Sequence, residues 1–160
     1  MKAMVVTPYF YPHMGGVQRY VYEIGTRLKR DYDMDVTVVC SNWDRATNYR
    51  HEAQLDGLRV IYIPYLFKVS STPVHPLWGR TLQTIVESEK PDIINGHAPV
   101  PFIADIAARV AQAQGIPYVL TYHNDLTGYN PLIRLYSRLY YRGLGDATLD
   151  AADRIIVTSN

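Results

Sequence analysis

The sequence predicts an α/β fold, in which a doubly wound, mainly parallel, Rossmann-like sheet lies between two layers of helices. Short apolar, β-branched runs alternate along the chain with longer segments whose apolar residues recur at helical spacing. Runs such as Met4-Val-Val and Val36-Thr-Val-Val39 are nearly continuous, which is typical of strands covered on both faces. Strands that alternate with helices favour a parallel sheet, and 160 residues suffice for one domain of this three-layer α/β/α kind.

The same periodicities place the individual elements. We expect strands at Lys2–Thr7, Asp35–Cys40, Leu58–Pro64, Asp92–His97, Tyr118–Tyr122 and Arg154–Thr158. We expect helices at Gly16–Arg30, Pro76–Lys90, Pro99–Gln114 and Pro131–Ala151. The segment Tyr65–His75 follows neither period, so we expect a loop there.

Composition excludes several classes of protein. A formal net charge of +1 argues against a dedicated nucleic-acid binder, which usually carries a basic stripe. The single cysteine, Cys40, allows no intrachain disulfide. The sequence has no run of 18 apolar residues and begins with a strand instead of a charged leader. We therefore expect a cytoplasmic protein without nucleic-acid partners.

Polar or glycine-rich residues follow four of the expected strands. These segments are Thr7 to Gly16, Cys40-Ser-Asn42, Asn95-Gly-His97 and Thr121-Tyr-His-Asn-Asp125. The carboxyl ends of parallel strands meet at one edge of a sheet, and ligands of doubly wound folds bind in the crevice beyond that edge. The four segments are therefore expected to form one site.

A glycine pair stands between the first strand and the first helix. Gly15 and Gly16 lack the Cβ that would keep an anion away from the backbone, and the first N–H groups of a helix have no helical partner. The pattern is neither G-x-G-x-x-G nor a P-loop. A phosphate site and a turn that simply needs glycine explain the pair equally well.

Two histidines stand at the ends of expected strands. His123 follows the run Tyr118–Tyr122, where it can hydrogen-bond a substrate hydroxyl or transfer a proton near neutral pH. The alternative is a histidine that caps the strand through backbone hydrogen bonds. His97 ends the preceding strand. The spacings typical of zinc sites are absent, so we expect no metal.

Three arginines recur every four residues in the last expected helix, at Arg134, Arg138 and Arg142. Leucines lie beside them, and a basic amphipathic helix can bind anionic lipid headgroups. A solvated arginine face above a core-facing stripe is the commoner explanation of such a pattern.

The segments that follow the expected strands, taken together with the last expected strand, resemble the N-terminal domain of a family 4 glycosyltransferase with the GT-B fold. The matching segments are Pro8-x-x-x-Pro12-x-x-Gly15-Gly16-Val17, Pro91-Asp-Ile-Ile-x-x-His97, Thr121-Tyr-His123 and Ala152-Asp-Arg-Ile-Ile-Val-Thr-Ser159. The resemblance implies that residues 1–160 are one half of a GT-B fold, in which two Rossmann-like domains face each other across a cleft. The N-terminal half of such enzymes mainly binds the acceptor, and the C-terminal half mainly binds the nucleotide-sugar donor. The family typically retains the anomeric configuration and needs no metal or other cofactor.

The resemblance also implies roles for individual residues. His123 would be the catalytic histidine that contacts the transferred sugar, and Gly15 and Gly16 would approach the donor diphosphate. The acceptor pocket would be formed by Tyr9, His13, Gln18, Arg19, His97, Asn124 and Asp125. Asn95 stands where the family often has another histidine. Nothing in the chain matches the motifs of the donor-binding C-terminal domain, so we expect this domain alone to be inactive.

The sequence thus predicts the acceptor-binding half of a retaining glycosyltransferase, a hexosyltransferase when complete. Its partners would be a nucleotide-sugar donor, a sugar or lipid-linked acceptor and the missing C-terminal domain. Contact of Arg134, Arg138 and Arg142 with the inner face of a membrane is a further expectation. The alternatives are a stand-alone module that binds a sugar or phosphate ligand, and half of another GT-B enzyme such as a nucleotide-sugar epimerase.

Overall fold

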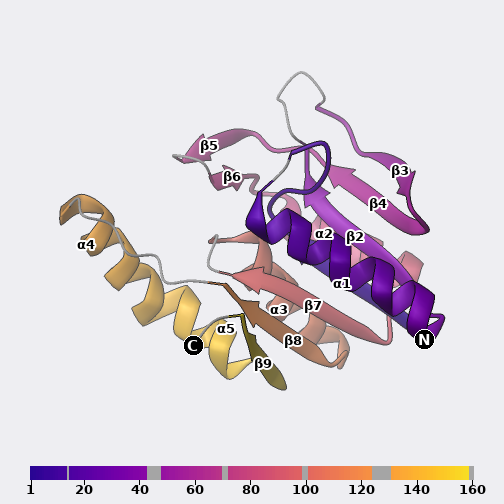
Figure 1. Cartoon of the computed structure of the whole chain (residues 1–160). Coiled ribbons are helices and arrows are strands. Elements are labelled where there is room, and N and C mark those ends of the chain that lie inside the picture. Colours follow the sequence, from indigo (N-terminus) through magenta and orange to yellow (C-terminus); the bar gives the residue numbers. More distant parts are fainter. Residues whose placement is uncertain (14, 43–47, 70–71, 99–100, 124–130, 159–160) are drawn as a thin grey trace.

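The computed structural model of the chain describes residues 1–13, 15–42, 48–69, 72–98, 101–123 and 131–158. The strands are β1 (Lys2–Thr7), β2 (Asp35–Ser41), β3 (His51–Leu55), β4 (Leu58–Ile63), β5 (Phe67–Val69), β6 (Thr72–Val74), β7 (Ile93–Ala98), β8 (Tyr118–Tyr122) and β9 (Arg154–Val157). The helices are α1 (Gly16–Tyr32), α2 (Trp78–Glu89), α3 (Ile103–Gln114), α4 (Pro131–Tyr140), the π-helical turn η1 (Tyr141–Gly145) and α5 (Asp146–Asp150). Figure 1 shows α1 in front of the main sheet and α2 and α3 behind it.

The main sheet has the strand order β3-β4-β2-β1-β7-β8-β9. Every neighbouring pair is parallel except β3 and β4, which run antiparallel. From β1, the chain extends the sheet first through β2 and β4 and then, on the other side, through β7, β8 and β9. The direction of winding therefore reverses between β1 and β7, which is where doubly wound folds form their ligand crevice. The predicted doubly wound, mainly parallel sheet is confirmed.

Alternate residues of the strands supply two cores, one on each face of the sheet. On one face, Val21 of α1 packs over Val5, Val38 and Val60. On the other face, Leu82 of α2 and Ala107 of α3 belong to a larger cluster, which also contains residues of five strands: Met4, Val6, Val39, Ile61, Ile63, Ile94, Tyr118 and Leu120. This alternation explains the unbroken apolar runs, because both faces of each central strand are buried.

Three elements differ from the sequence prediction. The antiparallel edge strand β3 was not expected; it is joined to β4 by Asp56 and Gly57, which both adopt positive φ as a two-residue hairpin requires. The predicted loop Tyr65–His75 contains the two-stranded ribbon of β5 and β6. The predicted helix Pro131–Ala151 is divided by η1 into α4 and α5.

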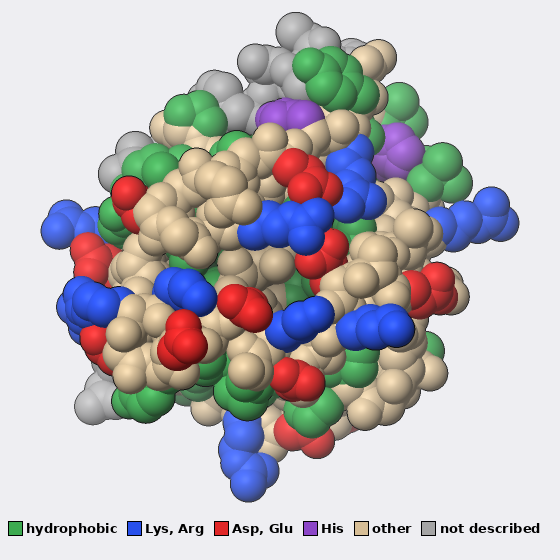
Figure 2. Space-filling view, turned by 90° about the vertical axis from the view of Figure 1, so that its right-hand side faces the viewer, with side chains coloured by type: hydrophobic (Ala, Val, Ile, Leu, Met, Phe, Trp, Pro, Cys, Tyr) green, Lys and Arg blue, Asp and Glu red, His purple; other side chains and the backbone are tan. Residues whose placement is uncertain are grey.

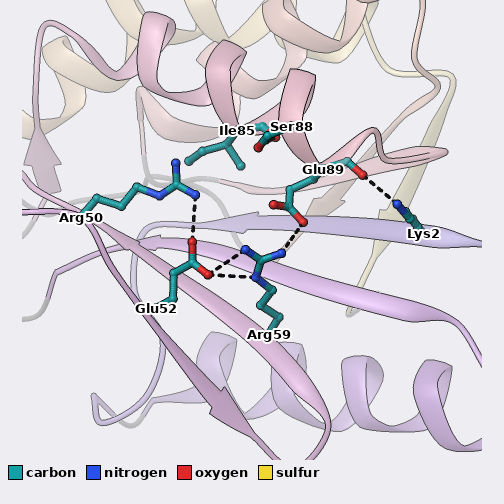
Figure 3. A network of polar contacts seen from close by, with 7 residues as sticks. All are labelled: Lys2, Arg50, Glu52, Arg59, Ile85, Ser88 and Glu89. Carbon is teal, nitrogen blue, oxygen red and sulfur yellow. Dashed lines mark hydrogen bonds and ion pairs between the residues drawn. The ribbon is translucent and has the colours of Figure 1, made fainter.

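Ion pairs connect β4 with β3 and with α2 near the amino ends of the parallel strands (Figure 3). Arg59 of β4 contacts Glu52 of β3 at 2.7 Å and Glu89 of α2 at 2.8 Å, and Arg50 contacts Glu52 at 2.9 Å. Lys2 of β1 donates to the backbone carbonyl of Glu89 at 3.3 Å. Figure 2, which faces the right-hand side of Figure 1, shows acidic and basic side chains interspersed on that surface, with no patch of a single sign.

Candidate functional site

The glycine pair stands at the N-terminus of α1, which follows β1 at the carboxyl edge of the sheet. Gly15 is the N-cap residue; no side chain caps the helix there, and its first turn carries no acidic residue. The first helical bond is donated by Arg19 N–H to Gly15 O at 3.0 Å. The N–H groups of the first turn therefore keep their partial positive charge, a pattern that suits an anion.

The two glycines have different surroundings. A Cβ on Gly15 would lie 2.5 Å from Oε1 of Gln18, whose side chain is buried over the loop. A Cβ on Gly16 would meet nothing within 4 Å. A side chain at Gly15 would thus displace the end of the Gln18 side chain, whereas the position of Gly16 is open to a ligand.

His97 and His123 come together beside this helix. His97 lies near the end of β7, and His123 follows β8, where its backbone N–H donates to Ala98 O at 3.1 Å. Nδ1 of His97 lies 2.8 Å from Nε2 of His123, a hydrogen-bonding distance. The ring centroids are 5.1 Å apart and the planes differ by 19°, as expected for two imidazoles joined in line, edge to edge, through facing nitrogens. The ring of His123 therefore bonds another side chain, while its backbone N–H continues the pairing with β7.

Burial keeps both imidazoles neutral. His97 is 2% exposed, and burial lowers its pKa to about 3, with a smaller effect from the repulsion that a protonated His123 would exert. His123 is partly buried, and desolvation lowers its pKa below the usual value of 6.5 as well. A pair of neutral imidazoles can hydrogen-bond, because one nitrogen carries the proton and the other a lone pair.

Tyr20, which the sequence interpretation missed, completes this cluster. It lies one turn after Gly16 on α1, and its ring packs edge-on against His123 at 5.2 Å and against His97 at 5.9 Å between centroids. The helical offset of four residues from Gly16 was the available signal, because it places both residues on the same face of α1. Tyr20 thus connects the two histidines, which its ring contacts, with the glycine pair at the start of the same helix.

The other predicted site residues lie in the same loop or on α1. Tyr9 is buried, packs against His13 with 5.3 Å between ring centroids, and has a pKa raised to about 12 by burial first and by Tyr65 second. Gln18 is buried and the side chain of Arg19 is exposed. Asn124 and Asp125 lie outside the described residues.

The β5–β6 ribbon adds a residue that sequence reasoning did not assign. The ammonium group of Lys68 lies 5.3 Å from the ring centre of Tyr9 and 5.0 Å from that of Tyr65. A cation is attracted to the face of an aromatic ring at this distance. The ribbon, predicted as a loop, thus brings a positive charge beside Tyr9 and Tyr65.

The three arginines of the helix after β8 are exposed, and so are Leu135 and Leu139, at 54% and 65%. Figure 1 shows α4 projecting from the body of the domain. Within the described ranges, no helix is long and apolar enough to cross a membrane. The same residues contain no group of three histidine, cysteine or acidic side chains placed to hold a metal ion.

Sequence relatives of the chain are glycosyltransferases. It is 26% identical over 154 residues to the GPI3 subunit of phosphatidylinositol N-acetylglucosaminyltransferase from Saccharomyces cerevisiae. The aligned region covers 95% of this chain and 32% of that protein. It is 28% identical over 145 residues to the O-antigen chain mannosyltransferase C of Escherichia coli, which covers 90% of this chain and 37% of that protein. The chain thus spans about a third of the length of the curated relatives it matches.

The fold of the chain is also shared with solved structures. An α,α-trehalose-phosphate synthase from Burkholderia vietnamiensis superposes with a TM-score of 0.58 at 10% identity, over 97% of this chain and 39% of that one. The sequence profile named Glycosyltransferase Family 4 matches residues 14–160, which is nearly the whole chain. This chain therefore belongs to glycosyltransferase family 4.

Proposed function

We propose that the chain is the acceptor-side half of a retaining glycosyltransferase that moves a sugar from a nucleotide-sugar donor to an acceptor. The observation that carries the proposal is the meeting of His123, His97 and the uncapped N-terminus of α1 at the edge where the winding of the sheet reverses. The relatives are glycosyltransferases, which favours sugar transfer over a binding module or an epimerase. A second domain, outside these 160 residues, would hold most of the donor.

The site can act on a donor through two kinds of group. His123 is neutral, and its Nδ1 can hydrogen-bond a hydroxyl of the transferred sugar. The N–H groups at Gly15 and Gly16 and the dipole of α1 would stabilise the negative charge that grows on the leaving diphosphate. Neither contribution needs a metal ion, since the charge is met by fixed backbone dipoles.

His123→Ala in the complete two-domain enzyme tests this assignment. We expect kcat to fall by about 10²-fold, the usual effect of losing one hydrogen bond to the reacting group, without a change in thermal unfolding temperature. Steady-state kinetics with the best donor–acceptor pair from a screen of nucleotide sugars supplies the measurement. An enzyme that keeps its fold and its turnover would exclude a catalytic role for His123.

A specific observation also supports a membrane-bound acceptor. Arg134 and Arg138 of α4 and Arg142 of η1 form no ion pair with any described residue, and α4 also exposes Leu135 and Leu139. Exposed arginines next to exposed leucines match an anionic lipid surface, where each cation contributes about 1 kcal/mol. One relative acts on phosphatidylinositol, a membrane lipid. We propose that α4 rests on the inner face of a membrane that carries a lipid-linked acceptor.

Vesicle binding tests the membrane contact. We expect the chain to sediment with phosphatidylserine vesicles at low salt, and the triple variant R134Q/R138Q/R142Q to bind about 10²-fold more weakly. The matched control, R80Q/R109Q/R154Q, removes the same charge from exposed sites outside α4 and should bind normally. Equal losses in the two variants, or equal binding to phosphatidylcholine, would contradict a specific α4 contact.

A further inference from the structure

His123 has two ring nitrogens, and the described residues of the protein hydrogen-bond one of them. Nε2 faces Nδ1 of His97 at 2.8 Å. Among the described residues, no hydrogen bond is made by Nδ1 of His123. A ligand at this edge of the sheet can therefore reach only Nδ1, and whether that atom is a donor or an acceptor depends on the bond at Nε2.

The position of His97 in the sheet restricts the movement of its side chain. It belongs to β7, which is paired on one side with β1 and on the other with β8, where His97 stands opposite Thr121. Its side chain is 2% exposed, so it cannot itself present much surface to an acceptor. The ring of Tyr20 packs against both imidazoles and restricts their rotation. A strand residue in the middle of a sheet positions its partner more rigidly than a loop residue could.

The in-line geometry has a chemical consequence. The hydrogen bond needs one N–H and one lone pair at the facing nitrogens, so the tautomer of neutral His123 is coupled to that of His97 and cannot change independently of it. An unbonded imidazole at this place would exchange its tautomers and rotate about χ2. A sugar hydroxyl would then meet the correct nitrogen for only part of the time.

We propose that His97 is a positioning residue for His123: it holds Nε2, fixes the ring and its tautomer, and leaves Nδ1 as the atom that meets the ligand. The effect on turnover rests on the proposed function, whereas the effect on the ring does not. His97 would thus act through His123 instead of binding the acceptor directly.

Nitrogen NMR of the 160-residue chain with ¹⁵N-labelled histidine tests the effect on the ring at neutral pH. In the wild type we expect one protonated and one bare nitrogen for His123, and a scalar coupling across the hydrogen bond to Nδ1 of His97. In His97→Leu, the two nitrogen shifts of His123 should move toward the averaged values of exchanging tautomers. In His97→Asn, whose amide stands where imidazole carries Nδ1, they should stay apart.

The NMR result is decisive in either direction. Averaged shifts in the wild type, or unchanged shifts in His97→Leu, would overturn the proposal. The coupling measured in the wild type decides whether the bond exists even if the leucine variant fails to fold.

Kinetics of the two-domain enzyme then tests the consequence. We expect His97→Leu to lower kcat by about 10- to 100-fold, as small misplacements of a reacting group do, while the acceptor KM stays unchanged. His97→Asn should restore most of the loss, and a rise in KM alone would show direct acceptor binding instead. If His123→Ala leaves turnover intact, the proposed function is wrong. The NMR experiment still tests separately whether His97 positions the ring of His123.

Discussion

Gly15 and Gly16 are adjacent at the start of α1, but their substitution should have different effects. Alanine at Gly15 would press on Oε1 of Gln18, a flexible side chain that is buried over the loop. Alanine at Gly16 would meet no atom within 4 Å and would replace an exposed glycine in the first turn of a helix. The contacts of the described residues therefore do not require glycine at position 16, and the proposed function supplies a reason for it in the close approach of a ligand.

Gly16→Ala separates these two causes. We expect the free energy of unfolding to change by less than about 0.5 kcal/mol, and the donor KM of the complete enzyme to rise, because the new methyl group keeps the diphosphate from the backbone. Urea titration and steady-state kinetics supply the two measurements. Gly79→Ala, in α2, is the matched control, since a Cβ there also meets nothing within 4 Å. An unchanged donor KM would remove the diphosphate role from Gly16.

The buried histidine also predicts how stability depends on pH. The pKa of His97 is about 3 in the folded protein and 6.5 when unfolded, so below pH 6.5 protons bind the unfolded chain more than the folded one. The free energy of unfolding should therefore be unaffected above about pH 7. As the pH is lowered from 6.5 to 5, the free energy of unfolding should decrease by up to about 1.4 kcal/mol per pH unit. Urea titrations at several pH values in this window give the free energy of unfolding, which should change less steeply with pH in His97→Asn than in the wild type. The same dependence on pH in both proteins would contradict the low pKa of His97.

At the scale of elements, one buried carboxylate connects α3 with α4 and α5. Asp105 of α3 is 2% exposed and accepts hydrogen bonds from Phe102 N–H at 2.7 Å, Tyr140 Oη at 2.9 Å and Thr148 Oγ1 at 2.6 Å. Phe102 has a φ of 83°, which is unfavourable for a bulky residue, so the bond from its N–H helps to hold the entry to α3. Burial, followed by Asp105, raises the pKa of Tyr140, which stays protonated and able to donate.

Asp105→Ala should therefore loosen the segment that contains α4, η1 and α5. We expect a loss of about 3 kcal/mol in the free energy of unfolding, because buried donors are left without an acceptor. Chemical denaturation measures it, and Asp150→Ala, on an exposed position of α5, should change stability by less than about 0.5 kcal/mol. A small effect at Asp105 would mean that water replaces the lost acceptor.

The elements that could be predicted from the sequence have a clear local pattern of apolar residues, whereas the elements that were missed do not. Central strands such as β1 and β7 are buried on both faces, so their apolar runs are unmistakable. The strand β3 is mostly exposed and carries polar residues, and its only local signal is the Asp56-Gly57 hairpin turn. The ribbon strands β5 and β6 are three residues each, too short for a period to show.

At the scale of the whole molecule, the chain presents one side of a site. The N-terminus of α1 offers an anion only partial positive charge, and the proposed function leaves most donor contacts to a second domain. We therefore expect the 160-residue chain to bind nucleotide sugars with dissociation constants well above about 1 μM. Isothermal titration with a panel of uridine- and guanosine-diphosphate sugars tests this expectation. Tight binding by this chain would contradict the two-domain account.

The sequence by itself determined the fold class and the edge of the sheet where the site lies. It could do so because both follow from local periodicity and from the rule that parallel strands end at one edge. The motifs in register also indicated the family, which the matching profile confirms.

Only the tertiary structure decided how the site residues contact one another. His97 and His123 are 26 residues apart and became partners because β7 pairs with β8 in one register. The same pairing buried His97 and left His123 partly accessible. Tyr20 and Lys68 joined the site through the packing of α1 and of a ribbon with no local pattern. Burial and side-chain contact depend on residues far away in the chain, so no local pattern contains them.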